Sequence, residues 1–426
     1  MAAISRTGPY YQLRASFFRN GSLFIGWLVI YSGVLLSPAL SLASDMSMQT
    51  HTQTKTMPHV IRTLKVDNTV NAVTWNADGS LLAALSDYGS VITVWDTKTW
   101  SIFKEFKRYG GAYSGNSFAF LKDGSLITST PVGKSPDPKY TDLSTMFSLI
   151  QWDVSSGTPL RYFPAPNSAH EKRLTGIGMT NTFTVSKDGT LIAGIGPQNV
   201  VLVYNARTTA LLYKLRIPIE WAPVHKFELI ESLAFSPDGK ELAIGTVADA
   251  AYKPDASAPG GALVHIFDAH TGKPLRYFWA YKKDSHTGDL YDIRRLAFSP
   301  DGKYIATGKR KAFNTVLPDD IAISIWKAHD GTLVSSLEGK TTDFTGKTEV
   351  FGTDSLSWYA DILASGEGSA LRLWSMNPPS SPKLIGVIDP SPTQVVGGAL
   401  VYSTAFSKNG LLAFSLENEI TILQFR

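Results

Sequence analysis

The sequence contains eight histidines, the residue type most often recruited for proton transfer and zinc binding. No two of them form a His-x-His or His-Glu-x-x-His pair, the spacings that bring two ring nitrogens to one metal ion. There is no cysteine, which excludes thiolate metal sites, cysteine nucleophiles and disulfides. A zinc site would need distant histidines to converge, so we interpret each as a solvated or core side chain. The eight are His51, His59, His170, His225, His265, His270, His286 and His329.

Other catalytic patterns are missing as well. The sequence has no Gly-x-Ser-x-Gly elbow, no phosphate-binding P-loop and no dinucleotide fingerprint. The acidic stretches Asp137–Asp142 and Asp319-Asp320 do not follow the ligand spacing of a calcium loop and fit solvated loop charges. We therefore predict no metal, no cofactor and no catalytic residues, in a protein that binds rather than catalyses.

Positive charge is concentrated at the N-terminus. The net charge is +4, but Arg6, Arg14 and Arg19 supply three of those charges and no acidic residue precedes Asp45. Without the first 43 residues the net charge is four minus three, or +1. Attraction to phosphates dominates nucleic-acid binding, so this balance argues against a nucleic-acid partner.

Residues 1–43 have the three-part pattern of a secretory signal peptide. Arginines precede an almost wholly apolar run, Leu23–Leu36, and Ser41-Leu42-Ala43 then offers small residues before a cleavage point at Ser44. The alternative is an uncleaved signal anchor, although the run is shorter than the roughly 20 residues that span a bilayer. Residues 44–57 are polar without periodicity, which favours a flexible lead-in. We predict an exported protein, periplasmic or extracellular, with membrane contact only through an uncleaved leader.

A repeated turn organises the remaining chain. Residues 233–240 and 296–303 both read Leu-Ala-Phe-Ser-Pro-Asp-Gly-Lys. Related turns occur at Asp78-Gly79, Asp123-Gly124, Asp188-Gly189 and Asn409-Gly410, and a unit around Tyr359-Ala360-Asp361 lacks the glycine. A turn of this kind between two short apolar runs predicts a β-hairpin.

Two further runs follow each hairpin. The third run usually ends in an aromatic residue and a polar one, as in the Trp-Asp pairs Trp95-Asp96 and Trp152-Asp153. The fourth comes after another short turn, such as residues 268–272. Four short strands in units of about 45–65 residues are typical of propeller blades.

Through these Trp-Asp pairs and Phe-Ser-Pro-Asp-Gly turns, residues 59–426 resemble the WD-repeat (WD40-type) β-propeller family. The resemblance implies a ring of four-stranded antiparallel blades. The chain departs from the family because the Gly-His pair that usually precedes each repeat is absent. The family's His–Ser–Asp–Trp hydrogen-bond tetrad is therefore not expected, and the blades must rely more on packing.

The strand count predicts how the ring closes. The last unit has only three strands, whereas one orphan strand, His59–Val66, precedes the first blade. If the orphan completes the last blade, no open seam of backbone groups remains. The predicted fold is all-β: a seven-bladed β-propeller of four-stranded antiparallel blades over residues 59–426, with the last blade closed by the N-terminal strand.

The two ends of this ring differ in loop length. With strands a to d counted outward from the axis, the a–b and c–d turns lie at one end and are nearly all short. The b–c and d–a loops lie at the other end and several are long, where a rigid scaffold commonly carries its function. The long b–c loops are Thr130–Met146, Ala248–Gly261 and Arg310–Asp320, in blades 2, 4 and 5.

Aromatic residues in these loops are the predicted interface anchors. They are Tyr140, Trp221, Tyr252, Tyr281, Tyr291 and Phe313. The alternative is that individual rings fold inward and pack under their own loops.

We predict a monomeric propeller that binds a protein or peptide partner. The alternatives are a propeller enzyme, quinone-dehydrogenase-like or hydrolase-like, and a small-ligand sensor, either with its site at the central channel. The enzyme alternative rests on residues 153–158 and 268–273, which resemble turns in quinone-cofactor dehydrogenase propellers.

Overall fold

The computed structural model describes residues 4–7, 10–19, 22–28, 58–87, 89–107, 117–129, 147–164, 182–196, 200–218, 228–248, 261–282, 291–311, 316–317, 321–342, 348–388 and 400–425. The chain forms two compact units, Met1–Asp45 and Met46–Arg426, which we describe separately. The first unit holds three antiparallel strands in the order β1 (Ile4–Thr7), β2 (Tyr10–Arg19) and β3 (Ser22–Leu28). Within the ranges given above, no helix is long and apolar enough to cross a lipid bilayer. The leader over residues 1–43 stays a prediction.

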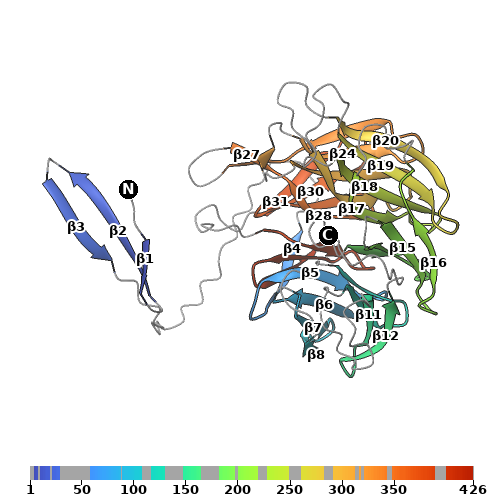
Figure 1. The fold of residues 1–426 in the computed structure, drawn as a ribbon, viewed down its shortest axis with the longest axis horizontal. Coiled ribbons are helices and arrows are strands. Elements are labelled where there is room, and N and C mark those ends of the chain that lie inside the picture. The colour runs from blue at the N-terminus through green and yellow to red at the C-terminus, as the bar shows by residue number, and fades with distance from the viewer. Residues whose placement is uncertain are drawn as a thin grey trace, which may run out of the picture. The chain divides into compact units, whose positions relative to one another are not determined.

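The second unit is a seven-bladed propeller of four-stranded antiparallel blades, which confirms the predicted fold (Figure 1). Blade 1 consists of β5 (Val70–Trp75), β6 (Leu81–Ser86), β7 (Val91–Asp96) and β8 (Ser101–Lys107). Blade 2 consists of β9 (Phe118–Phe120), β10 (Leu126–Ser129), β11 (Phe147–Asp153) and β12 (Thr158–Pro164). Blade 3 consists of β13 (Phe183–Val185), β14 (Leu191–Gly196), β15 (Val200–Asn205) and β16 (Leu211–Leu215). Blades 4 and 5 consist of β17 (Glu228–Phe235), β18 (Glu241–Ala248), β19 (Gly261–Asp268) and β20 (Pro274–Lys282); and β21 (Tyr291–Phe298), β22 (Tyr304–Lys311), β24 (Ile321–Lys327) and β25 (Leu333–Glu338). Blade 6 consists of β28 (Thr353–Tyr359), β29 (Ile362–Glu367), β30 (Ala370–Ser375) and β31 (Lys383–Ile388).

Blade 7 is closed by the N-terminal strand, as predicted. Its sheet has the order β32 (Thr404–Phe406), β33 (Leu412–Leu416), β34 (Glu419–Gln424) and β4 (His59–Lys65). Pairing runs from Glu419↔Lys65 to Gln424↔His59, so the strand is one residue shorter than the predicted His59–Val66. Each inner strand contacts the inner strands of both neighbouring blades, in the circuit β5, β9, β13, β17, β21, β28, β32 and back to β5.

In blades 3 to 5 a Ser-x-Asp-Gly sequence is the hydrogen-bonding unit of the tight a–b turn. In blade 4 the Ser236 hydroxyl donates to Asp238 Oδ1 at 2.6 Å and accepts the backbone N–H of Glu241 at 2.9 Å. Gly239 occupies the left-handed region at φ +73°, where glycine carries no Cβ penalty. The bond from Ser236 is the main reason that the pKa of Asp238 lies below its usual value.

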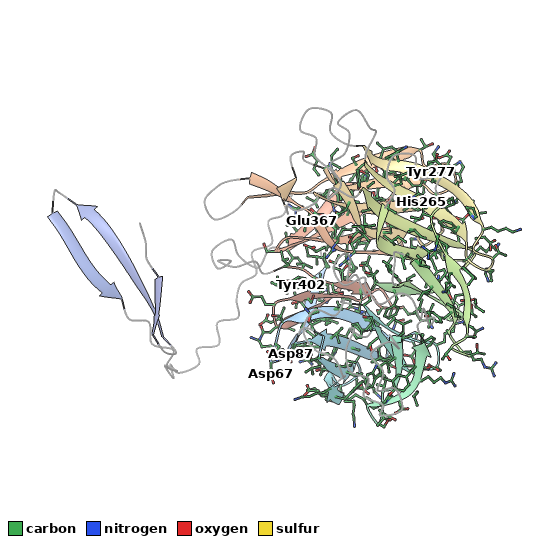
Figure 2. The ribbon with its side chains drawn as sticks, viewed as in Figure 1. Asp67, Asp87, His265, Tyr277, Glu367 and Tyr402 are labelled. Carbon is green, nitrogen blue, oxygen red and sulfur yellow. The ribbon has the colours of Figure 1, made fainter. Side chains whose placement is uncertain are left out.

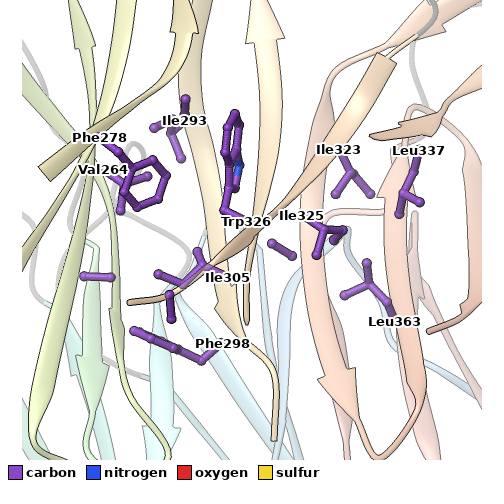
Figure 3. Packing of buried hydrophobic residues seen from close by; sticks show 14 of the residues in the cluster. Val264, Phe278, Ile293, Phe298, Ile305, Ile323, Ile325, Trp326, Leu337 and Leu363 are labelled. Carbon is purple, nitrogen blue, oxygen red and sulfur yellow. The ribbon is translucent and has the colours of Figure 1, made fainter. Parts of the chain in front are cut away.

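Apolar side chains fill the space between the blades. The cluster between blades 4, 5 and 6 includes Phe278 and Trp326, whose ring centroids are 5.5 Å apart, and extends to Leu363 (Figure 3). The Trp326 indole N–H donates to Thr307 Oγ1 at 2.9 Å on the neighbouring b strand. Trp152 makes the equivalent bond to Thr128 in blade 2, at 3.0 Å. These tryptophans therefore have a buried partner without the histidine of the family tetrad.

Outer strands add a second set of links between blades. In four blades the outer strand carries a hydrogen-bond donor at the same position, four residues after the residue with positive φ in the c–d turn. The side chain of this residue donates to a backbone carbonyl in the c–d turn of the next blade. Arg276 donates to Ala328 O at 2.9 and 2.7 Å, and Ser335 donates to Pro379 O at 2.8 Å. Tyr213 and Arg161 make the corresponding bonds to Ala269 O and Arg207 O. Four consecutive interfaces, from blade 2 to blade 6, share this link.

Candidate functional site

The inner strands carry a repeated irregularity near their first residues. The register with the b strand shifts once in each of blades 1, 4, 5 and 6, which leaves one residue out of the ladder. In blade 7 the Ser415 N–H donates to Ser403 O. This bond is equivalent to the first pairing after the bulge in the other blades, so Tyr402, the residue before Ser403, occupies the bulge position. We call this set the inner-strand bulge residues: Asn71, Glu231, Arg294, Asp354 and Tyr402.

Burial indicates that the inner-strand bulge residues face the axis of the ring. The residue before each of them is buried, as for Ile230 at 2% and Ile293 at 0% exposure, whereas all five bulge residues are partly exposed. An inner strand has its b strand on one edge and a neighbouring blade on each face. The remaining directions are the central channel and the nearby end of the ring, so solvent reaches these side chains at the channel mouth.

Opposite charges alternate around one side of this ring. The Arg294 guanidinium of blade 5 lies 3.3 Å from the Glu231 carboxylate of blade 4, with side chains 28% and 11% exposed. Arg295 donates from Nε to the Asp354 carbonyl of blade 6 at 2.7 Å. Asn71 Oδ1 and Arg294 Nε are buried atoms that have no hydrogen-bond partner within the described part of the chain. The ring thus holds a carboxylate–guanidinium pair and two buried polar atoms without a hydrogen-bond partner among the described residues.

In blades 4 to 7 the residue after the bulge ties its blade to the next. Ser232 Oγ donates to Ile293 O at 2.7 Å, and Ser355 Oγ donates to Val401 O at 3.1 Å. Ser403 Oγ accepts the Val73 N–H at 3.0 Å, across the seam between blades 7 and 1. The bulge residues are therefore held by bonds on either side, which positions their side chains.

The b–c and d–a segments meet at one end of the propeller. A three-stranded sheet joins β23 (Val316–Leu317) in the b–c loop of blade 5 to β27 (Thr348–Phe351) and β26 (Lys340–Thr342) in the following d–a loop. In blade 1 the Asp87 N–H of the b–c turn donates to Thr69 O in the d–a segment at 3.2 Å. Figure 2 shows Asp67, Asp87 and Tyr402 on the same side of the propeller unit. We call this the long-loop end; the inner-strand bulge residues lie next to it.

Tyr281 does not lie where it was predicted. It belongs to β20, which continues past the predicted loop boundary and pairs Tyr281 with Ala262. The side chain is only 7% exposed, its hydroxyl donates to Thr307 O at 2.9 Å, and its ring packs edge-on against Trp326. The prediction of an exposed anchor at Tyr281 is corrected: the residue packs between blades 4 and 5, because extension of the outer strand keeps it in the ladder.

The other predicted anchors are not assembled into a site by the described residues. Tyr291 begins the inner strand β21 rather than lying in a loop. Tyr140, Trp221, Tyr252 and Phe313 lie outside the described residues.

Sequence reasoning missed the inner-strand bulge residues, although alignment of the seven inner strands could have found them. A polar residue precedes Ser-Leu-Ala-Phe or a close variant in each, and Asn116 and Asn181 hold the position in blades 2 and 3, also outside the described residues.

Titratable groups away from the channel are engaged in packing. Glu367 and Arg372 form a buried ion pair in blade 6, 3.5 Å apart, and burial raises the pKa of Glu367. Burial also raises the pKa of Tyr213 to about 12. Over the ranges that the structure describes, no three His, Asp or Glu side chains gather in a way that could hold a metal ion.

Comparison with known proteins agrees with this architecture. The family model described as "WD domain, G-beta repeat" matches residues 280–312, which run from the end of the outer strand of blade 4 through the first two strands of blade 5. No curated protein matches the chain. The matched residues include the Phe-Ser-Pro-Asp-Gly turn of blade 5 and the Arg294 bulge. Together with the seven four-stranded blades, this match over one blade supports a WD40-type β-propeller.

Proposed function

We propose that this protein is an exported scaffold that binds a protein or peptide partner on its long-loop end, over the mouth of the central channel. The observation that carries the proposal is the sheet β23–β27–β26, in which a b–c loop and a d–a loop are built into one added structure. Ordered structure added to the loops at one end extends the surface available to a partner. Leader cleavage and export rest on the pattern of residues 1–43.

The opposite end offers much less to a partner. Five of its seven a–b turns are tight Asp-Gly turns whose polar groups are already satisfied locally, as for Ser299 and Asp301 at 2.6 Å. Their glycines adopt positive φ, which leaves little freedom to elaborate the turn. Long loops at one end and constrained turns at the other favour the long-loop end as the partner site.

The inner-strand bulge residues supply the polar part of this proposed interface. The Glu231–Arg294 pair is partly desolvated, and a partner that covers the channel mouth would shield it further. Reversal of one charge leaves two like charges across a blade interface, whereas reversal of both restores an attractive pair. The double charge reversal therefore keeps the attraction between the two side chains but inverts the charges presented to the partner, so it distinguishes an effect on partner binding from an effect on the ion pair.

The test is capture of envelope proteins on immobilised residues 44–426, with cross-linking and mass spectrometry. We expect Glu231→Arg and Arg294→Glu each to weaken capture, and the double swap to restore the melting temperature without restoring capture. The matched control is Lys240→Glu in a tight a–b turn, where Lys240 is exposed beside Asp238. Truncation of a true loop anchor, with Trp221→Ala and Tyr252→Ala as first choices, should cost about 2 kcal/mol of binding. Capture that survives shortening of the long b–c loops but is lost with Lys240→Glu would place the partner at the other end.

A further inference from the structure

The exposed apolar side chains of the propeller follow one rule. Across the described ranges, every large hydrophobic side chain that is exposed lies on an outer strand, and all of them except Val60 of β4 lie within the first four residues after a c–d turn. Those of blades 1 to 3 are Ile102 at 58%, Phe103 at 49%, Leu160 at 51% and Leu212 at 46% exposure. They lie away from the long-loop end, so they do not belong to the proposed partner site.

Cations accompany the apolar side chains in the same three blades. Strands β8, β12 and β16 carry four Lys or Arg against one Glu. Each pairs an apolar residue with a nearby cation; we call the set Phe103, Lys104, Leu160, Arg161, Leu212 and Lys214 the outer-edge patch. Figure 1 shows β8, β12 and β16 at the periphery of the propeller. Charged residues on an edge strand are expected as a guard against edge-to-edge aggregation, but half-exposed Leu and Phe beside them are not.

Blades 4 and 5 have equivalent apolar residues without the free charge. Leu275 is 47% exposed and is followed by Arg276, but Glu241 neutralises that guanidinium with bonds of 2.8 and 2.7 Å. Leu333 is 51% exposed on β25, whose only charged residue is Glu338. Among the described residues of these five outer strands, an exposed apolar residue followed within two positions by a cation outside any ion pair is found on β8, β12 and β16.

We propose that the outer-edge patch docks on an anionic phospholipid surface. Peripheral membrane binding has two contributions: apolar side chains insert into the lipid–water interface, and cations are attracted to anionic headgroups. The convex edge presents one apolar site per blade, and fluid lipid can surround separate side chains without a preformed pocket for each. The chain enters the ring through β4 of blade 7, which adjoins blade 1, and the apolar run Leu23–Leu36 ends 23 residues before His59. Before cleavage at Ser44, blades 7 and 1 are thus the part of the ring joined to the membrane-directed leader.

The experiment is sedimentation of residues 44–426, which hold every strand of the seven blades, with phosphatidylcholine vesicles with and without phosphatidylglycerol. We expect binding only with phosphatidylglycerol present, weakened by salt. The double variant Leu160→Ser/Leu212→Ser should bind about tenfold more weakly. Lys104→Glu/Lys214→Glu should lose at least about tenfold, since each cation near the surface contributes about fivefold.

The matched control is Leu275→Ser/Leu333→Ser, which removes equally exposed leucines at the corresponding strand positions of blades 4 and 5. It should leave vesicle binding within about twofold, because rim positions outside a contact contribute little. Melting temperatures exclude unfolding as the cause. The proposal is overturned if the unaltered protein ignores anionic vesicles, if the control weakens binding as much as Leu160→Ser/Leu212→Ser, or if the patch variants abolish self-association instead, which would assign the patch to a second copy of the chain.

Discussion

The Arg276 guanidinium forms a bidentate pair with the Glu241 carboxylate, with Nη1–Oε1 at 2.8 Å and Nη2–Oε2 at 2.7 Å. The same guanidinium donates to Ala328 O in the next blade. One side chain therefore joins the second strand of blade 4, the outer strand of blade 4 and the c–d turn of blade 5. This propeller lacks the Gly-His tetrad, and side-chain bonds such as these help to hold its blades together.

Arg276→Lys should destabilise the propeller by about 1–2 kcal/mol, because lysine cannot make two parallel bonds to a carboxylate and also reach the Ala328 carbonyl. Chemical denaturation measures the change. The matched control is Arg161→Lys, at the same strand position in blade 2, where the guanidinium is exposed and its bond is to the Arg207 carbonyl. We expect less than about 0.5 kcal/mol there. Equal losses would show that the Glu241 pair contributes nothing of its own.

Removal of the closing strand should damage the whole ring. Leu64 on β4 packs in the cluster that includes Ile420 and Ile422, and the strand supplies the outer ladder of blade 7. Deletion of residues 44–65 should lower the melting temperature by about 10 °C or more. Deletion of residues 44–57 leaves β4 intact and should change it little. Calorimetry of the two truncations decides the matter, and coincident melting curves would refute closure by β4.

Two turn glycines separate backbone strain from steric overlap. Gly239 and Gly331 have nearly the same φ, +73° and +71°. A Cβ added at Gly239 would meet nothing within 4 Å, whereas one at Gly331 would overlap the Phe278 side chain of the neighbouring blade. Gly239→Ala should cost about 1 kcal/mol from the left-handed backbone, and Gly331→Ala about 1–3 kcal/mol more. Urea denaturation of both variants tests the difference, and similar losses would mean that Phe278 moves away without cost.

The buried Glu367–Arg372 pair should depend on both partners. Glu367→Gln or Arg372→Met alone should destabilise by about 3–5 kcal/mol, since each leaves a buried group without its partner, while the double variant should lose much less. A double-mutant cycle from denaturation curves measures the coupling, and additive losses would contradict it.

The same pair predicts a pH dependence. Burial raises the pKa of Glu367 in the folded protein, and Arg372 and Ser365 only partly offset this. A folded-state pKa above the unfolded one contributes stability below the unfolded pKa, and that contribution is lost as pH rises through the folded value. The stability of the unaltered protein relative to the double variant should therefore decrease as the pH rises above about 4, the usual glutamate pKa. An increase over that range would show that Arg372 outweighs burial.

N-terminal sequencing of the protein from its native cell should give a first residue near Ser44. The small residues Ser41 and Ala43 stand at the positions that a signal peptidase reads, after an apolar run. Ala43→Arg should block processing and leave a longer product. A full-length product in the cytoplasm would contradict both the signal peptide and the export proposal.

The blade count and the closing strand were determined by the sequence alone. Most blades carry the same local signals: short apolar runs, an Asp-Gly or Asn-Gly turn and an aromatic residue at the end of the third strand. These act over a few residues, so they can be read without knowledge of the fold. The missing fourth strand after Phe425 and the orphan at His59–Val66 then left one economical way to close the ring. The unequal loop lengths at the two ends follow from the same strand order.

Tertiary structure alone decided which side chains face the channel, the blade interfaces and the outer edge. Tyr281 sits in a sequence that fits a loop anchor, yet its surroundings are Thr307 and Trp326 of the next blade. Glu231 and Arg294 are 63 residues apart and meet because consecutive inner strands lie side by side. Contacts between blades join residues that share no local pattern, and a bulge that shifts the register by one residue redirects a side chain. Local patterns therefore specify the blades, and only the closed ring specifies what each blade presents to its neighbours, the channel and the solvent.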